Sequence, residues 1–97
     1  MKISLVPAAE EDIFEAATFY EQTGSAAVAA KFVAEFKRAA HVLLEFPNIG
    51  TPRQRGTRAF SLSLFPYTVI YRQTTDGITI LVVKHQRRRP TYGTQRK

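Results

Sequence analysis

The hydrophobic pattern of this chain changes its period near the middle, from a helical repeat to strand-like runs. A short apolar segment, 2–6, leads into Pro7, whose fixed φ and missing N–H suit the first turn of a helix. Apolar residues then recur at helical spacing in two adjacent segments. The pattern predicts one helix over 8–22 and a second helix between Ser25, its N-cap, and Pro47. Two helices joined by so short a link form an antiparallel hairpin with one shared apolar face.

The second half of the chain is typical of an antiparallel sheet. Segment 46–56 is rich in proline, glycine, asparagine and arginine, which predicts an exposed basic loop. Strand-like runs follow at 57–64, 67–74 and 78–85. The step Asp76-Gly77 between the last two runs is a strong signal for a hairpin turn. The sequence therefore predicts at least three antiparallel strands after the helices.

The last predicted strand is apolar on both faces, which places it inside the sheet rather than at an edge. If its side chains alternate strictly, Ile78, Ile80 and Val82 share one face, and Leu81 and Val83 share the other. The helix hairpin can cover only one of these faces. We expect the other face to be covered by the C-terminal tail or by a partner protein, because an uncovered apolar patch is itself a binding site.

At 97 residues the chain has the size of one domain, 1–97, with a flexible tail expected at 93–97. The predicted fold class is α+β, with an N-terminal strand and an antiparallel helix hairpin packed on a mainly antiparallel sheet. The element order is strand, helix, helix, strand, strand, strand. The sequence contains no cysteine, no membrane-length apolar run and no signal-peptide pattern, so we expect a cytoplasmic protein without disulfides or membrane contact.

Charge is distributed unevenly along the chain, although the formal net charge is only +6. Residues 1–45 carry four basic and seven acidic side chains, a net charge of −3. Residues 46–97 carry ten basic side chains and one acidic side chain, a net charge of +9. Such asymmetry favours phosphate-bearing or acidic partners for the second half, and a surface that is merely solvated is the alternative.

The basic half ends in a cluster that follows the last strand directly. The run 84–92 contains a histidine, an arginine triplet and a tyrosine, which is a composition suited to meeting an anion. If the strand continued, Arg87 and Arg89 would point to the face opposite Arg88, so only part of the triplet would serve one site. His85 is the best candidate acid or base, and a hydrogen-bonded histidine at the end of a sheet is an equal alternative. The two histidines of the chain have no ligand spacing, so we expect no metal and no cofactor.

Several other polar and aromatic residues read as structural. The acidic residues of the first helix are interpreted as a solvated face, and His41 as a residue on the flank of the second helix. Three tyrosines are interpreted as packing residues. The acidic face consists of Glu10, Glu11, Asp12 and Glu15, and the three packing tyrosines are Tyr20, Tyr67 and Tyr71.

The element order and a series of short motifs resemble the RelE/ParE superfamily of bacterial toxins over nearly the whole chain. The motifs are Phe19-Tyr20, Phe46-Pro47-Asn48-Ile49-Gly50, Arg58, Phe65-Pro66-Tyr67, Ile70-Tyr71-Arg72 and the ending His85-x-x-Arg88-x-Pro90-x-Tyr92. The resemblance implies a small toxin encoded beside an antitoxin, which covers the toxin in an oligomeric assembly until proteolysis frees it. It also implies a role in growth inhibition or plasmid stabilisation.

The superfamily includes two activities. ParE-like members bind and poison DNA gyrase and are not enzymes, whereas RelE-like members cleave messenger RNA in the ribosome without a metal. A third, separate reading is a basic module that binds nucleic acid. That reading lacks a recognition helix, because the apolar stripe of the second helix is needed for the core.

Cleavage of RNA would need a base, a cation that stabilises the phosphorane and an acid. His85, Tyr92 and Arg58 are the candidate catalytic residues if the chain is a nuclease. Arg53, Arg55 and Arg88 are the candidates for binding phosphate or the target. Many cleaving relatives have lysines or a carboxylate where this chain has arginines around 53–55, and arginine does not deprotonate in proteins. This departure and the terminal motif favour the ParE-like reading.

Overall fold

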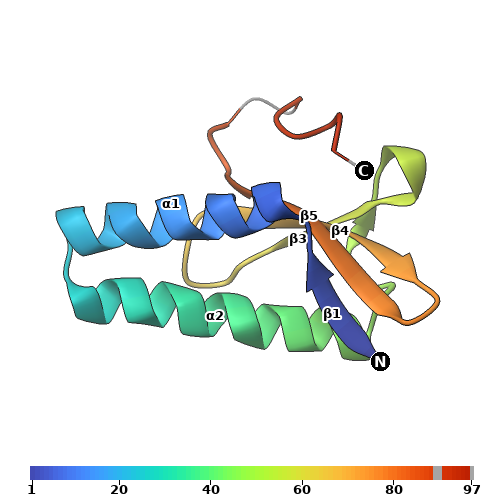
Figure 1. Cartoon of the computed structure of the whole chain (residues 1–97), viewed down its shortest axis with the longest axis horizontal. Coiled ribbons are helices and arrows are strands. Elements are labelled where there is room, and N and C mark those ends of the chain that lie inside the picture. The colour runs from blue at the N-terminus through green and yellow to red at the C-terminus, as the bar shows by residue number, and fades with distance from the viewer. Residues whose placement is uncertain (89–90, 97) are drawn as a thin grey trace.

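An antiparallel helix pair packs on one face of a five-stranded sheet in the computed structural model, which describes residues 1–88 and 91–96 (Figure 1). The elements, in chain order, are β1 (Lys2–Leu5), α1 (Pro7–Thr23), α2 (Ala26–Glu45), β2 (Thr51–Pro52), a 3-10 turn η1 (Gln54–Gly56), β3 (Arg58–Ser61), β4 (Tyr67–Thr74) and β5 (Gly77–His85). The predicted α+β class and element order are confirmed, and β2 is a short strand within the predicted loop. Arg89 and Pro90 of the predicted terminal motif, and Lys97 of the predicted tail, lie outside the described residues.

Both helices begin and end within one residue or two of their predicted positions. α1 starts at Pro7, and its N-cap Val6 is in the extended conformation that is favoured before proline. α2 starts after Ser25, whose Oγ accepts a hydrogen bond from the Val28 N–H at 3.2 Å. No helix in the described part of the chain is long and apolar enough to cross a membrane.

The sheet order is β1-β5-β4-β3-β2, so β5 is an interior strand as predicted. β1 pairs with β5 in parallel, and the other neighbouring strands pair antiparallel. β3 ends at Ser61 rather than at 64, because the next residues turn toward β4. In that turn the Leu62 N–H donates to the Tyr67 carbonyl oxygen at 2.9 Å.

The expectation of strict alternation along β5 was wrong. Ile70 of β4 is opposite Val82, and the next β4 residue, Tyr71, is opposite Ile80, so Leu81 is an extra residue in β5. Such a β-bulge places two successive side chains on one face. Leu81 and Val82 accordingly both join Ile70 on the face away from the helices, whereas Val83 belongs to the core under the helices.

The main core lies between the helices and the sheet and is rich in aromatic rings. Phe32 is fully buried and contacts Phe65 and Tyr67 edge to face, with ring centroids 5.3 and 5.1 Å apart. Tyr71 is also fully buried, and its hydroxyl donates to the Pro47 carbonyl oxygen at 2.8 Å. The interpretation of Tyr67 and Tyr71 as packing residues is therefore confirmed.

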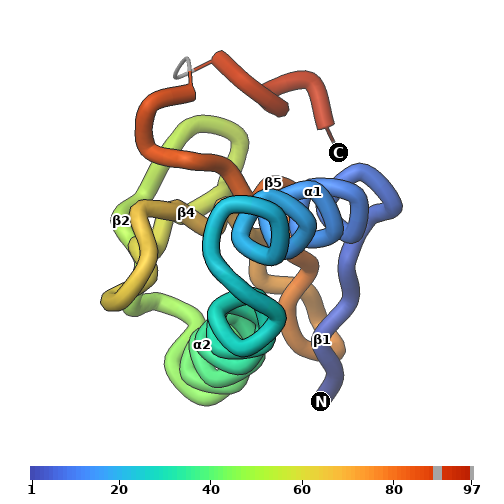
Figure 2. Tube along the Cα trace, turned by 90° about the vertical axis from the view of Figure 1, so that its left-hand side faces the viewer, coloured from blue at the N-terminus to red at the C-terminus, as the bar shows by residue number. Residues whose placement is uncertain are grey.

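The second face of the sheet is covered by residues 91–96, which we call the C-terminal segment and which are one of the two covers expected from the sequence. Tyr92 packs against the apolar cluster of Ile70, Leu81 and Val82, and Gly93 is buried. A Cβ at Gly93 would lie 2.6 Å from Val82 Cγ2, so only glycine allows this approach. Figure 2 shows this segment beside α1, on the side away from α2. The flexible tail expected at 93–97 stays a prediction.

Candidate functional site

His85 is the last residue of β5 and lies half-buried against Tyr67 of the neighbouring strand. The two rings meet edge to face, with centroids 5.2 Å apart and planes at 80°. The Arg87 N–H donates to His85 Nδ1 at 3.1 Å. Burial raises the pKa of the Tyr67 phenol, so this neighbour of His85 is neutral over the physiological pH range.

A hollow of about 190 Å³ lies beside His85, between the middle of α1 and the end of β5, and Asp12 is among the α1 residues that line it. We call it the His85 hollow. The hollow is lined by the aromatic rings of Phe19 and Tyr67 and by the polar side chains of Glu15, His85 and Arg88. Tyr92 also lines it, so the structure brings together three of the predicted site residues: His85, Arg88 and Tyr92.

Arg88 reaches this hollow from a turn and not from a continued strand. The Arg88 N–H donates to the His85 carbonyl oxygen at 2.9 Å, and the Gln86 N–H donates to the Pro66 carbonyl oxygen at 2.9 Å. The alternation expected for the arginine triplet therefore does not apply beyond His85. The Arg88 guanidinium carbon lies 4.7 Å from the centre of the Tyr92 ring, within the range of a cation–π contact.

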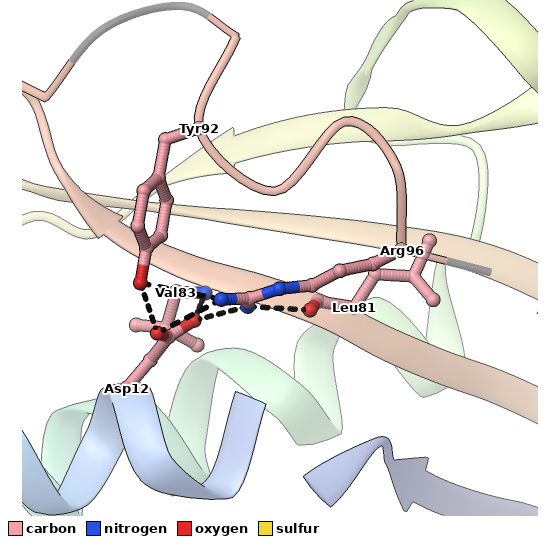
Figure 3. Close-up of polar contacts among 5 residues, drawn as sticks. All are labelled: Asp12, Leu81, Val83, Tyr92 and Arg96. Atoms are coloured by element: carbon pink, nitrogen blue, oxygen red, sulfur yellow. Dashed lines mark hydrogen bonds and ion pairs between the residues drawn. The ribbon is translucent and has the colours of Figure 1, made fainter. Parts of the chain in front are cut away.

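Asp12 of α1 is the centre of a buried polar cluster that connects α1, β5 and the C-terminal segment (Figure 3). Its Oδ2 accepts hydrogen bonds from the Val83 N–H at 3.0 Å and from Arg96 Nη1 at 2.6 Å. Its Oδ1 accepts a hydrogen bond from the Tyr92 hydroxyl at 2.7 Å. Arg96 Nη1 also donates to the Leu81 carbonyl oxygen at 3.0 Å, so the ion pair is completed by further hydrogen bonds.

The protonation states in this cluster follow from these contacts. The hydrogen bond to Asp12 is the main cause that raises the pKa of the Tyr92 phenol, and burial adds to it. The same carboxylate raises the pKa of the Arg96 guanidinium. Tyr92 is therefore a neutral donor, and its proton is already used within the fold.

The interpretation of Asp12 as part of a solvated acidic face was wrong, because only 6% of Asp12 is exposed. A signal for this existed in the sequence. Asp12 lies three residues after Ala9 and four before Ala16, the two buried alanines of α1, so it falls on the buried stripe of that helix. For Arg96 the sequence offered no signal.

Arg58 lies at a different place in the sheet. Its Nη1 donates to the carbonyl oxygens of Gly50 at 2.9 Å and of Asn48 at 3.2 Å, which ties the loop after α2 to β3. Arg58 pairs with Tyr71, which pairs with Ile80. Arg58 is therefore level with Ile80 of β5. Ile80 lies five residues before His85, or about 16 Å along the strand. Arg58 is also not among the residues that line the His85 hollow with His85 and Tyr92, so the structure does not bring it to that pair.

Arg53 and Arg55 line a second, smaller cavity of about 30 Å³ on the sheet face that the C-terminal segment covers. Arg55 adopts a left-handed conformation with φ of 60°, and its Nη1 donates to the Thr94 carbonyl oxygen at 3.2 Å. Arg72 donates to the Arg55 carbonyl oxygen at 3.0 Å. Burial is the main cause that lowers the pKa of Lys84, which lines the His85 hollow, and the positive charge of Arg53 adds to this shift.

The arrangement around the His85 hollow is suited to binding rather than to proton transfer. It combines aromatic walls, a histidine and an exposed arginine at the end of the sheet. The Tyr92 hydroxyl is held by Asp12, and the Arg58 guanidinium is held by loop carbonyl oxygens. Among the described residues no group of three or more histidine, cysteine or acidic side chains has the geometry to hold a metal ion.

Comparisons with known proteins agree with the fold and with the motifs. The family model described as "ParE toxin of type II toxin-antitoxin system, parDE" matches residues 3–90. A solved structure titled "Chromosomal ParDE TA system from P. aeruginosa" is similar with a TM-score of 0.77 and 20% identity, over 88% of this chain and 95% of that one. No curated protein matches the chain. Because the family model covers most of the sequence, the chain belongs to the ParE family, the toxins of type II toxin–antitoxin systems.

Proposed function

We propose that this ParE-family toxin arrests growth by binding DNA gyrase, and that the surface around the His85 hollow contacts the target. The family match over residues 3–90 carries the proposal, because the ParE-like branch of the superfamily acts on gyrase without catalysing a reaction. Arg88, exposed at the mouth of the hollow and stacked on Tyr92, is the side chain that we expect to meet an acidic or phosphate group of the target.

Two observations favour binding over RNA cleavage. The hydroxyl of the candidate acid Tyr92 donates a hydrogen bond to Asp12, and Arg58 donates to two loop carbonyl oxygens far along the sheet from His85. A nuclease needs an acid, a base and a cation around one scissile phosphate. RelE-like cleavage therefore remains as the outcome that the experiments below must exclude.

The family implies an antitoxin as partner. We propose that its acidic residues meet the basic second half of the chain, where ten basic side chains stand against one acidic side chain, and that the two proteins form an oligomeric complex. We further propose that both proteins act in the cytoplasm, where gyrase and ribosomes are found.

The first experiment tests the toxin role and the contact surface together. Induced expression of the chain in bacteria should stop growth, and co-expression of the neighbouring small reading frame should restore it. Arg88→Ala should weaken the arrest about tenfold, the loss expected for one charged contact at an interface. Lys31→Ala is the matched control, because it removes one exposed positive charge from α2, away from the hollow. Growth that is indifferent to induction would refute the toxin role, and equal effects of the two variants would refute the surface.

The second experiment separates the two targets. Purified wild-type chain should inhibit supercoiling by gyrase and should leave a reporter transcript intact on translating ribosomes. Ribosome-dependent cleavage that is lost in His85→Ala would instead establish the nuclease reading. Cleavage that survives in both His85→Ala and Tyr92→Phe would reject these residues as its catalytic groups.

A further inference from the structure

The Asp12 carboxylate connects segments that are far apart in the sequence. Figure 3 shows it rising from α1 to meet Tyr92 and Arg96, which descend from the C-terminal segment, beside the backbone of β5. Its side chain is only 4% exposed. A buried carboxylate is tolerated only where its partners are in place, so it favours the one conformation of the segment that supplies them.

The contacts continue from this cluster to the exposed surface. The Tyr92 hydroxyl is held by Asp12 at 2.7 Å, and Arg96 Nη2 donates to the same hydroxyl at 3.2 Å. These bonds fix the ring on which the Arg88 guanidinium stacks, 4.7 Å from its centre. Asp12 also lines the His85 hollow, and its hydrogen bonds to Tyr92 and Arg96 connect it to Arg88 through the Tyr92 ring.

We propose that Asp12 is a positioning residue for target binding, which holds the C-terminal segment so that Tyr92 and Arg88 present one fixed surface. This inference rests on the proposed function, because it assumes that Arg88 contacts the target. It adds that the binding surface is set from α1, by a residue at the other end of the chain.

Glu35 of α2 provides a matched control within the same molecule. It too is a buried helical carboxylate, 5% exposed, that bonds an arginine and a backbone N–H. Its Oε1 accepts from Arg38 at 2.7 Å, and its Oε2 accepts from the Ser63 N–H at 3.1 Å. It holds the turn between β3 and β4 and does not line the His85 hollow. Loss of Glu35 therefore measures the structural cost of losing such a carboxylate.

The decisive experiment is a double-mutant cycle between Asp12→Asn and Arg88→Ala in the full chain, read as growth arrest at matched expression. If Asp12 positions Arg88, then Arg88→Ala should weaken arrest about tenfold in the wild-type background but less than about twofold with Asp12→Asn. In the Glu35→Gln background, Arg88→Ala should keep its full effect. Thermal unfolding of the same variants checks that each one is folded at the temperature of the growth assay. Equal effects of Arg88→Ala in all three backgrounds would overturn the proposal.

A second pair of variants covers the case in which Asp12→Asn does not fold. Tyr92→Phe removes the hydroxyl that donates to Asp12 and keeps the ring on which Arg88 stacks. Its cycle with Arg88→Ala should show the same loss of additivity, and an additive result would again overturn the proposal.

The experiments distinguish a wrong role for Asp12 from a wrong target for the toxin. Arrest without gyrase inhibition would reject the gyrase target, while the cycle on growth still decides the role of Asp12. If the chain does not arrest growth at all, a titration of the Tyr92 phenol still tests its hydrogen bond to Asp12. The Tyr92 signal is obtained as the difference between the wild type and Tyr92→Phe. The Tyr92 pKa should fall in Asp12→Asn, because the main cause that raises it is removed. An unchanged Tyr92 pKa would refute the hydrogen bond between Tyr92 and Asp12.

Discussion

At the scale of single residues, the chain uses buried carboxylates to join its helices to its sheet. Asp12 and Glu35 both lie on apolar stripes, and both accept a backbone N–H of the other layer. Each also bonds an arginine, so neither charge is buried alone. These bonds specify how helix and sheet are placed more sharply than apolar contacts alone, because hydrogen bonds depend on direction.

Glu35 should make stability depend on pH in the acidic range. The hydrogen bond from Arg38 is the main cause that lowers the pKa of Glu35 below its ordinary value. A carboxyl group with a lowered pKa in the folded state stabilises the fold above the unfolded pKa of about 4.3, and the contribution is lost as the pH falls through the folded pKa. The gap in melting temperature between wild type and Glu35→Gln should therefore be widest near neutral pH and shrink below about pH 4.

Glu45→Gln is the control for that titration, because Glu45 is exposed at the end of α2. It should change the free energy of unfolding by less than about 0.5 kcal/mol at every pH. A gap for Glu35→Gln that is constant from neutral to acidic pH would contradict the assigned role of its charge.

The residue scale is also where sequence reasoning was least able to find the site. His85, Arg88 and Tyr92 were predicted together, because residue type and a terminal motif identify them. Asp12 was misread because an acidic trio at a helix start has a simple explanation in the helix dipole. Its place on the buried stripe was readable, but its partners Tyr92 and Arg96 lie 80 and 84 residues away in sequence, beyond any local pattern.

At the scale of elements, local signals account for most of the observed boundaries. Ser25 caps α2, and the Asp76-Gly77 step joins β4 to β5 as expected. The bulge at Leu81 was not predictable, because an extra residue in a continuous apolar run leaves no trace in its composition. It matters for the site, because it turns Val83 toward α1, where the Val83 N–H meets Asp12.

Ser25→Ala tests the start of α2. The substitution removes the oxygen that accepts the Val28 N–H, so we expect a loss of about 1 kcal/mol in unfolding free energy, measured by denaturant titration. Ser25→Asp should keep most of the stability, because aspartate is an equally good cap. If alanine and aspartate at this position are equally stable, the cap is not formed.

Gly93→Ala tests whether the C-terminal segment packs on the sheet as described. Gly93 has a φ of +77°, and its Cβ would lie 2.6 Å from Val82. The cost should be about 1–3 kcal/mol, from strain in the left-handed region together with the clash. Gly56→Ala is the control, because Gly56 has a similar φ of +70° but open space around its Cβ. Equal losses for the two variants, measured by thermal unfolding, would mean that the segment does not lie against Val82.

At the scale of the whole molecule, the acidic first half forms most of the helical layer, and the basic second half forms most of the sheet and its C-terminal cover. The sequence predicted this division and left open what covers the second sheet face. The segment around Tyr92 and Gly93 supplies the cover, held by the carboxylate of a helix in the acidic half. The binding surface that we propose is therefore a product of both halves.

The central claim is that the chain acts by occupying gyrase through the surface around His85, and not by turnover of a substrate. The most direct measurement is a titration of gyrase supercoiling with purified chain, followed by the same titration with Arg88→Ala. We expect complete inhibition by wild type near an equimolar ratio, and about tenfold more Arg88→Ala for the same inhibition. Supercoiling that is unaffected by an excess of folded wild type, together with multiple-turnover cleavage of messenger RNA on ribosomes, would contradict the account.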